Sequence, residues 1–254
     1  MLSVQLVSGK VKDKDTIVVY YSTGNGTNTN DFLYPLPKQL FSDLIKIKSK
    51  KKNLTPFFQC PAMSGNMKST YFFESPFDMT YHYDFKDVHK GQSFFQGVRI
   101  LSDRDDTLSI GPMIRLELQF FLFAEEPLET MFTPPYFHKP KHQNYGAVLP
   151  GVFDIGQWFR PYVTEFQMWN ETGELVLEKG EPLFYMGFNT NKKIIFKRFE
   201  MTDKLHKSSK NIVATSSMFP TGTSLFERYK DFRNVGLREK ILKEIKENVI
   251  DDIR

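Results

Sequence analysis

Two side chains with metal-ligand chemistry stand two residues apart in an aromatic stretch, at His82 and Asp84. Side chains at i and i+2 of a strand point to the same face, so both could reach one metal ion. A later histidine, His138 or His142, would complete a set of two histidines and one carboxylate, the facial triad of non-haem iron sites. The spacing therefore raises an iron-dependent enzyme as one hypothesis.

This arrangement on a jelly-roll sheet is similar to that of 2-oxoglutarate oxygenases. The resemblance implies an arginine on the strand after the distal histidine, where it binds the carboxylate of the cosubstrate. Lys139 and Lys141 follow His138 instead, and an ammonium group cannot form the bidentate fork of a guanidinium. We therefore favour a solvated pair of His82 and Asp84 on an exposed strand face, and we predict no bound metal and no cofactor.

A second candidate set begins at Leu149-Pro150-Gly151-Val152-Phe153-Asp154 and continues through Trp158-Phe159-Arg160 to Gly180-Glu181-Pro182-Leu183. Residues 149–188 resemble the hairpin region of dUTPases and dCTP deaminases. The resemblance implies that Asp154 orients a water molecule and that Arg160 lies near phosphates. The chain departs from that pattern because Pro161 stands where glycine is expected, no Pro-Arg-Ser loop precedes it, and no glycine-rich C-terminal arm follows. We interpret the stretch as a similar β-hairpin layout without catalysis.

The same stretch offers side chains suited to binding. Trp158, Phe159 and Tyr162, together with Arg160, could form a stacking platform for a base or a sugar. Core aromatic residues beside one surface arginine would explain the same pattern. We take Asp154, Trp158 and Arg160 as the candidate binding residues.

Nucleophilic catalysis finds little support in the chain. Cys60 precedes Pro61 in an aromatic region that we expect to be strand, which predicts a buried, unreactive thiol. No Gly-x-Ser-x-Gly elbow occurs, and the segment Gly24-Asn25-Gly26-Thr27 lacks the Gly-Lys-Ser/Thr ending of a phosphate-binding loop. Because no catalytic set is complete, we favour a function other than an enzyme.

The composition of the chain bears on its compartment and on its partners. The chain has 254 residues, a net charge of +4 and one cysteine, which fits a reducing compartment. The mild positive charge is compatible with a nucleic-acid partner, but we interpret the lysine run within residues 46–52 as solvated. We see no basic leader followed by an apolar stretch and no apolar run of about 18 residues, so we predict no secretion signal and no membrane span.

The elements that must position these side chains are predicted to be strands. The 25 phenylalanines and 11 tyrosines favour half-buried pleated surfaces. The clearest strand covers residues 114–123, where apolar residues alternate and Phe121 and Phe123 add a second buried face. We also expect a strand at 16–21, a short helix at 37–46 and strand-like runs within 57–85.

Residues 164–168, 175–177, 183–188 and 192–200 form a second series of apolar runs separated by turn residues. Their short connections predict three or four antiparallel strands joined as a meander. The fold class that follows is mainly β: an antiparallel, jelly-roll-like β-sandwich.

The chain ends with a different pattern. Apolar residues between 237 and 253 recur at spacings of three and four, which predicts an amphipathic helix. We expect this helix to pack on the flank of the sheet; pairing with another copy or a partner is the alternative. The predicted organisation is a β-sandwich domain over 1–215 and a C-terminal helical segment over 216–254 packed on it.

Several short phrases, read together, resemble one family of viral proteins. These phrases are Phe58-Gln59-Cys60-Pro61-Ala62, Phe73-Glu74-Ser75-Pro76-Phe77-Asp78, Thr133-Pro134-Pro135-Tyr136, Phe153-Asp154-Ile155-Gly156-Gln157-Trp158-Phe159-Arg160-Pro161 and Gly180-Glu181-Pro182-Leu183-Phe184-Tyr185. Their order and spacing, over roughly residues 55 to 230, resemble uncharacterised proteins encoded by tailed phages of marine bacteria, cyanobacterial myoviruses among them. The resemblance implies a viral origin and a location in the virion or the host cytoplasm, and it carries over no functional residue.

We therefore predict a phage-encoded, non-catalytic structural or binding protein, either a virion component or a host-interaction protein. The predicted antiparallel sheet, the aromatic excess and the amphipathic helix motivate a protein partner or self-association. The alternative is an enzyme on a β-sheet scaffold. That enzyme would be nucleotide-directed through Asp154 or iron-dependent through His82 and Asp84.

Overall fold

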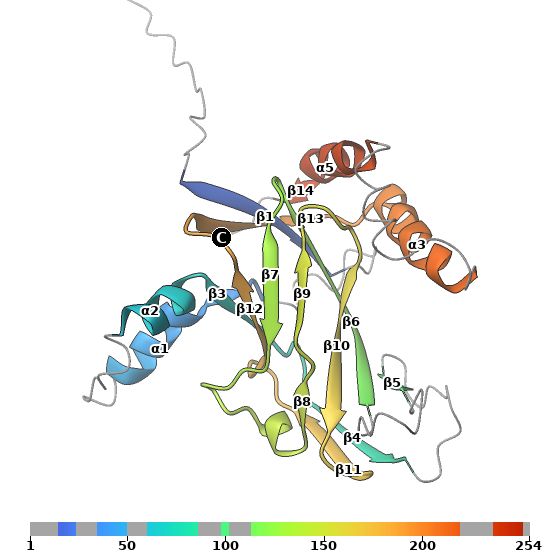
Figure 1. The fold of residues 1–254 in the computed structure, drawn as a ribbon. Coiled ribbons are helices and arrows are strands. Elements are labelled where there is room, and N and C mark those ends of the chain that lie inside the picture. Colours follow the sequence, from blue (N-terminus) through green and yellow to red (C-terminus); the bar gives the residue numbers. More distant parts are fainter. Residues whose placement is uncertain are drawn as a thin grey trace, which may run out of the picture.

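The computed structural model describes residues 15–23, 35–49, 60–85, 98–101, 113–218 and 236–250. The fold is mainly β, with two larger sheets and a two-stranded sheet at one end (Figure 1). The fold class predicted from the alternating apolar residues is thus confirmed at the level of a β-sandwich with antiparallel sheets.

The larger sheet contains seven strands in the order β14-β13-β1-β6-β10-β8, with β5 also paired to β6. All its pairings are antiparallel except that of β1 with β13. Its strands are β1 (Thr16–Ser22), β5 (Val98–Leu101), β6 (Met113–Ala124), β8 (Gly146–Val148), β10 (Pro161–Met168), β13 (Lys193–Phe199) and β14 (Val249–Ile250).

The second sheet contains five strands in the order β2-β3-β12-β7-β9, all antiparallel. Its strands are β2 (Lys38–Gln39), β3 (Thr70–Glu74), β7 (Glu129–Thr133), β9 (Gly151–Asp154) and β12 (Pro182–Phe188). A two-stranded sheet pairs β4 (Met79–Asp84) with β11 (Thr172–Leu177).

The inner faces of the two larger sheets share one hydrophobic core. Phe120 of the seven-stranded sheet meets Phe73 and Phe184 of the five-stranded sheet, with ring centroids 5.6 and 5.8 Å apart. Phe73 and Phe184 also stack on each other at 4.7 Å. Aromatic pairs at such distances add stabilisation beyond their buried area. The aromatic excess of the sequence is thus concentrated between the sheets.

Helices cover the outer faces. Helices α1 (Leu40–Ser49) and α2 (Pro61–Lys68) pack on the five-stranded sheet, around a second core cluster that includes Phe72 and Tyr185. Helices α3 (Asp203–Met218) and α5 (Leu237–Glu247) lie at the other end of the molecule (Figure 1). A 3-10 helix, η3 (Lys141–Asn144), precedes β8.

The C-terminal helix packs on the sheet, as predicted. Ile241 and Ile245 of α5 are buried against Phe121 and Phe123 of β6. Arg238 also donates hydrogen bonds to the backbone carbonyl oxygens of residues 124, 125 and 156. The helix is shorter than predicted because it ends at Glu247, after which Val249–Ile250 pairs with β13 as a strand.

The predicted meander is wrong, although its four strands exist. Strand β10 pairs with β6 and β8, β11 with β4, β12 with β3 and β7, and β13 with β1 and β14. Alternation of apolar residues specifies which face of a strand is buried, but it does not specify the neighbouring strand. Each short turn here carries the chain into a different sheet.

Two local predictions also need correction. Pro61 begins helix α2, so residues 61–68 are helical within a region expected to be strand, since proline is well tolerated in the first turn of a helix. Cys60 lies at the N-terminal end of this helix and is exposed, so the thiol is not buried as predicted. The lysines at 50–52 and the loop at 24–31 lie outside the described residues.

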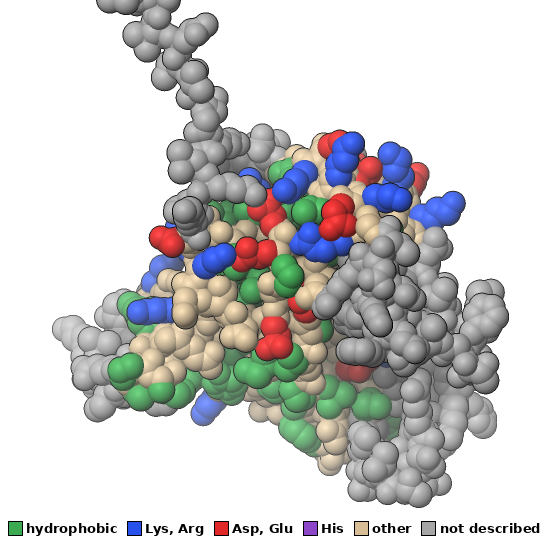
Figure 2. Space-filling model, turned by 45° about the horizontal axis from the view of Figure 1, so that its top comes forward, with side chains coloured by type: hydrophobic (Ala, Val, Ile, Leu, Met, Phe, Trp, Pro, Cys, Tyr) green, Lys and Arg blue, Asp and Glu red, His purple; other side chains and the backbone are tan. Residues whose placement is uncertain are grey.

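No helix in the described part of the chain is both long and apolar enough to cross a membrane. Charged side chains of both signs gather over the end that carries α5, whereas hydrophobic side chains are exposed farther from that helix (Figure 2). Ion pairs such as Lys246 with Glu125, at 2.9 Å, join the two signs at the helical end.

Candidate functional site

A groove opens where two neighbouring strands part. Strand β8 pairs with β10, and the backbone N–H of Leu149 donates to the carbonyl oxygen of Glu165 at 2.9 Å. Beyond Pro150 the chain leaves the seven-stranded sheet and pairs with β7 as β9, the terminal strand of the five-stranded sheet. The space between β9 and β10 is a groove of about 370 Å³.

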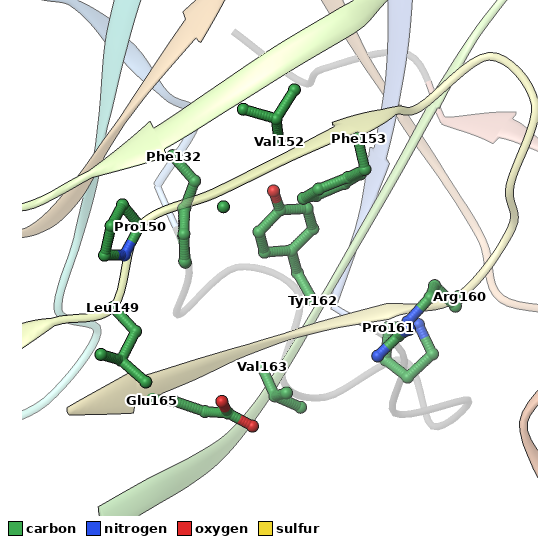
Figure 3. Close-up of a pocket in the computed structure, with 11 residues that line it drawn as sticks. Phe132, Leu149, Pro150, Val152, Phe153, Arg160, Pro161, Tyr162, Val163 and Glu165 are labelled. Atoms are coloured by element: carbon green, nitrogen blue, oxygen red, sulfur yellow. The ribbon is translucent and has the colours of Figure 1, made fainter. Parts of the chain in front are cut away.

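Aromatic rings form the floor of this groove. The ring of Tyr162 lies 4.3 Å from that of Phe153 and 5.0 Å from that of Phe132, measured between centroids. These three side chains point between β9 and β10 in Figure 3. The walls add apolar side chains from both strands and from the segment that joins β8 to β9: Leu149, Pro150, Val152, Pro161 and Val163.

The backbone of β9 presents a free edge beside this floor. The N–H of Ile155 donates to the carbonyl oxygen of Leu128, and the Thr130 hydroxyl donates to the carbonyl oxygen of Phe153, so the backbone groups of residues 153 and 155 face β7. Hydrogen-bonded and non-hydrogen-bonded pairs alternate along an antiparallel ladder. The backbone N–H and C=O of Val152 therefore point away from β7, towards the edge where the described part of the chain places no further strand.

Two charged side chains stand along the groove, one just before β10 and one within it. Glu165 is paired with Arg115, whose Nε donates to it at 2.8 Å. Arg160 precedes β10 and is exposed to solvent. Within the described residues, no carboxylate forms an ion pair with Arg160, so the uncompensated charge of the groove is positive.

The structure separates the three predicted binding residues. Arg160 lines the groove, as in Figure 3. Trp158 is buried and is not among the lining residues. The carboxylate of Asp154 accepts hydrogen bonds from the backbone N–H groups of Leu128 and Gly156, both at 2.8 Å, and from the side chain of Gln157. Asp154 therefore fixes the turn at the end of β9.

The turn after Asp154 explains a glycine in the sequence. A Cβ atom on Gly156 would lie 2.0 Å from the carbonyl oxygen of Glu126, well inside van der Waals contact. Only glycine allows this close approach of two backbone segments. The hairpin that resembles the dUTPase layout is thus held by the close packing of two backbone segments at Gly156 and by the hydrogen bonds that the Asp154 carboxylate accepts.

The predicted iron ligands lie on different parts of the molecule. His82 and Asp84 share the exposed face of β4, as the period of two predicted, and His82 Nδ1 lies 3.9 Å from Glu174 on β11. His138 and His142 each have another partner, described below. No group of three potential metal ligands occurs within the residues that the structure describes.

His138 belongs to a polar seam under α1. Its Nε2 lies 3.0 Å from the Asp43 carboxylate and its Nδ1 contacts the hydroxyl of Tyr185. Both contacts are hydrogen bonds if Nε2–H donates to Asp43 and Nδ1 accepts from Tyr185. Burial raises the pKa of Tyr185, so its hydroxyl stays protonated and can donate. The seam joins α1 to β12.

His142 lies in the core. Its ring packs edge-on against Phe166 at 5.2 Å, and Nε2 donates to the carbonyl oxygen of Pro182 at 3.0 Å. Burial lowers the pKa of His142, an effect that the bond to Pro182 partly offsets. This histidine therefore stays neutral in the folded protein at neutral pH.

A second hollow of about 360 Å³ lies between α2, β7 and the turn after β12. Its rim is mostly polar: Asn66, Ser69, Glu129, Asn189, Thr190 and Asn191. Asn189 and Glu129 bond to each other through both backbone and side chain, at 2.9 and 3.3 Å. The aromatic floor and free strand edge distinguish the groove between β9 and β10 from this hollow.

Phe132, Val152 and Val163 line the groove but were not predicted as binding residues from the sequence. A signal was available in the two prolines, Pro150 and Pro161, which stand at the start of each parting strand and cannot donate to a strand partner. A scan against models of protein families finds no match, and a search among curated proteins finds no relative. The groove must therefore be interpreted from its own geometry.

Proposed function

We propose that this protein is a non-catalytic binding protein that holds a protein partner in the groove between β9 and β10. The observation that carries the proposal is a groove with an aromatic floor beside a strand edge. Concave apolar sites with a few polar groups bind ligands, and free strand edges are a recurring contact surface for other chains. The partner is either another protein or a second copy of this chain.

The ionisable groups around the groove support binding over catalysis. Glu165 is paired with Arg115, and Asp154 is used by three donors in its turn. A general acid or base needs a side chain within hydrogen-bond reach of the reacting atom. Arg160 is the lining residue with an available charge, and a guanidinium that stays protonated is suited to bind an anionic group.

The proposal includes a viral setting, which rests on the sequence resemblance to proteins of tailed phages. The protein would then be a virion component or a protein that meets a host partner in the cytoplasm. Mass spectrometry of purified particles and of infected host cells tests this part. We expect the protein in one of the two fractions, and its absence from both would count against the viral setting alone.

A photoreactive residue in the groove tests the binding function. Val152 is 60% exposed, so Val152→benzoylphenylalanine should fold normally. We expect light to join this variant to one defined protein in the cells that naturally express the chain. Ile195, exposed on β13 of the other sheet, is the matched control position and should give no such product.

A second variant ties any product to the groove. Val163→Lys places an ammonium group at the wall without touching the aromatic floor, so the photoproduct at Val152 should disappear while the melting temperature stays within about 2 °C. Equal products at Val152 and Ile195, or no product at either, would contradict the proposed function.

A further inference from the structure

We infer that the groove receives an extended segment of the partner chain, which adds as a strand to the edge of β9 and places a carboxylate at Arg160. This inference rests on the proposed binding function and specifies how the partner is held. It differs from docking of a folded surface because it uses the backbone of β9 as well as the side chains of the groove.

The first support is the direction of backbone groups on both sides of the groove. The N–H and C=O of Val152 point away from β7, as derived above from the bond between Ile155 and Leu128. On β10, the carbonyl oxygen of Glu165 points towards β8, and Val163 lies two residues away, beside the irregularity between Tyr162 and Thr164 in the pairing of β10 with β6. Strand β8 pairs only with residues 166–168. The groove therefore lies between two backbone edges.

The second support is the match between a strand and the groove floor. Side chains of an added strand alternate between its two faces. One set would lie on the rings of Phe132, Phe153 and Tyr162, which are already positioned by their mutual contacts. The groove volume of about 370 Å³ is at the small end for ligand sites, so it suits a few side chains of a strand.

The third support is charge. Glu165 is neutralised by Arg115, whereas Arg160 presents an exposed guanidinium at another point of the groove. Arginine forms bidentate, charge-assisted hydrogen bonds with carboxylates. An apolar segment with an aspartate, a glutamate or a terminal carboxylate therefore complements this groove better than a basic segment.

Displayed peptides provide a direct probe. A library of random linear octapeptides is selected on the wild-type protein, with removal of peptides that also bind the Val163→Lys variant. We expect the enriched sequences to alternate apolar residues and to carry an acidic group. The best peptide is then synthesised with a free acid, with an amide in place of that acid, and with N-methyl groups on alternate backbone amides.

Strand addition predicts a register effect. N-methylation of the amides that face β9 should weaken binding at least tenfold, whereas N-methylation of the other set should weaken it less than threefold. Binding should also slow hydrogen exchange at the backbone amide of Val152. The variant Arg160→Gln should weaken the acidic peptide about tenfold and leave the amide form almost unchanged.

Each failure has a separate meaning. Tight binding without a register effect keeps the groove as a binding site but overturns strand addition. Equal loss of the acidic and amide peptides in Arg160→Gln overturns the carboxylate contact. If Val152 forms a photoproduct in cells but no linear peptide is enriched, a folded surface is recognised and the inference is wrong. Absence of the photoproduct and of enriched peptides contradicts the proposed function itself.

Discussion

On the outer face of the five-stranded sheet, one half is covered by helices and the other half is exposed. Over β3 and β12, helices α1 and α2 cover Phe72 and Tyr185, which are 3% and 0% exposed. Over β7 and β9, the neighbouring residues Met131 and Val152 pair in register and remain 46% and 60% exposed. The same sheet therefore has one half packed against α1 and α2, beside an apolar half over which the described part of the chain places no helix.

The covered half shows what a permanent interface in this molecule contains. Apolar packing from Leu40 and Leu44 is combined with the polar seam of Asp43, His138 and Tyr185, in which both ring nitrogens of His138 have a partner. Buried polar groups destabilise a fold unless they are hydrogen-bonded. The bare half has apolar side chains and a free strand edge, on which a separate chain could pack and form hydrogen bonds.

The largest difference between the halves should appear on truncation of side chains. Leu40→Ala in the covered half should lower the free energy of unfolding by about 2–5 kcal/mol, because it leaves a cavity at a fully buried position. Chemical denaturation measures this change. A loss below about 1 kcal/mol would mean that α1 is not a fixed part of the sheet cover.

The polar seam should give the next largest effect. His138→Ala removes both bonds of the ring, to the Asp43 carboxylate and to the Tyr185 hydroxyl, so we expect a loss of about 1–3 kcal/mol. A double-mutant cycle with Tyr185→Phe isolates the contact between the two side chains. Strict additivity in that cycle would contradict a shared seam.

His142, on the 3-10 helix η3, should make stability depend on pH. Burial lowers the pKa of His142 in the folded protein, so the unfolded chain binds a proton first as the pH falls below about 6.5. Stability is therefore full above that pH and declines below it, by at most about 1.4 kcal/mol per pH unit for one proton. Denaturation of wild type and His142→Gln between pH 5 and 8 tests this; a constant difference would contradict it.

The smallest effect on stability should come from the bare half. Val152→Thr keeps a β-branched residue at an exposed strand position, so the free energy of unfolding should change by less than about 0.5 kcal/mol. The same change adds a hydroxyl to the apolar wall and should reduce formation of the partner complex. A large loss of stability would show that Val152 belongs to the core and would remove the contrast between the halves.

The strands could be predicted from the sequence more reliably than their partners. The alternation of apolar residues predicted the long strand at 114–123, including the burial of both faces near its end. The spacing of apolar residues at 237–245 predicted the last helix. The pairing of β1 with β13 and the dispersal of β10 to β13 over three sheets depend on contacts between distant residues. A local pattern carries no information about those contacts.

The candidate site was predicted only in part. Arg160 lines the groove, but Trp158 and Asp154 do not, because residues 155–160 form a turn and an irregular connection between β9 and β10 rather than a strand. The groove depends on the point after β8 at which the chain leaves β10 and joins β7 as β9, and this point is set by packing between two sheets. Two prolines mark it in the sequence, yet prolines mark many ordinary turns as well.

The parallel pairing of β1 with β13 has a consequence for how the molecule is made. Strand β1 lies between β6 and β13, and its register joins Thr16 to Lys193. On the ribosome, β1 must therefore keep one edge unpaired until residues 193–199 have emerged. Contacts between such distant segments slow folding, and nascent chains with unpaired edges are prone to aggregate. Efficient production of this protein should benefit from slow synthesis or from a chaperone that shields β1.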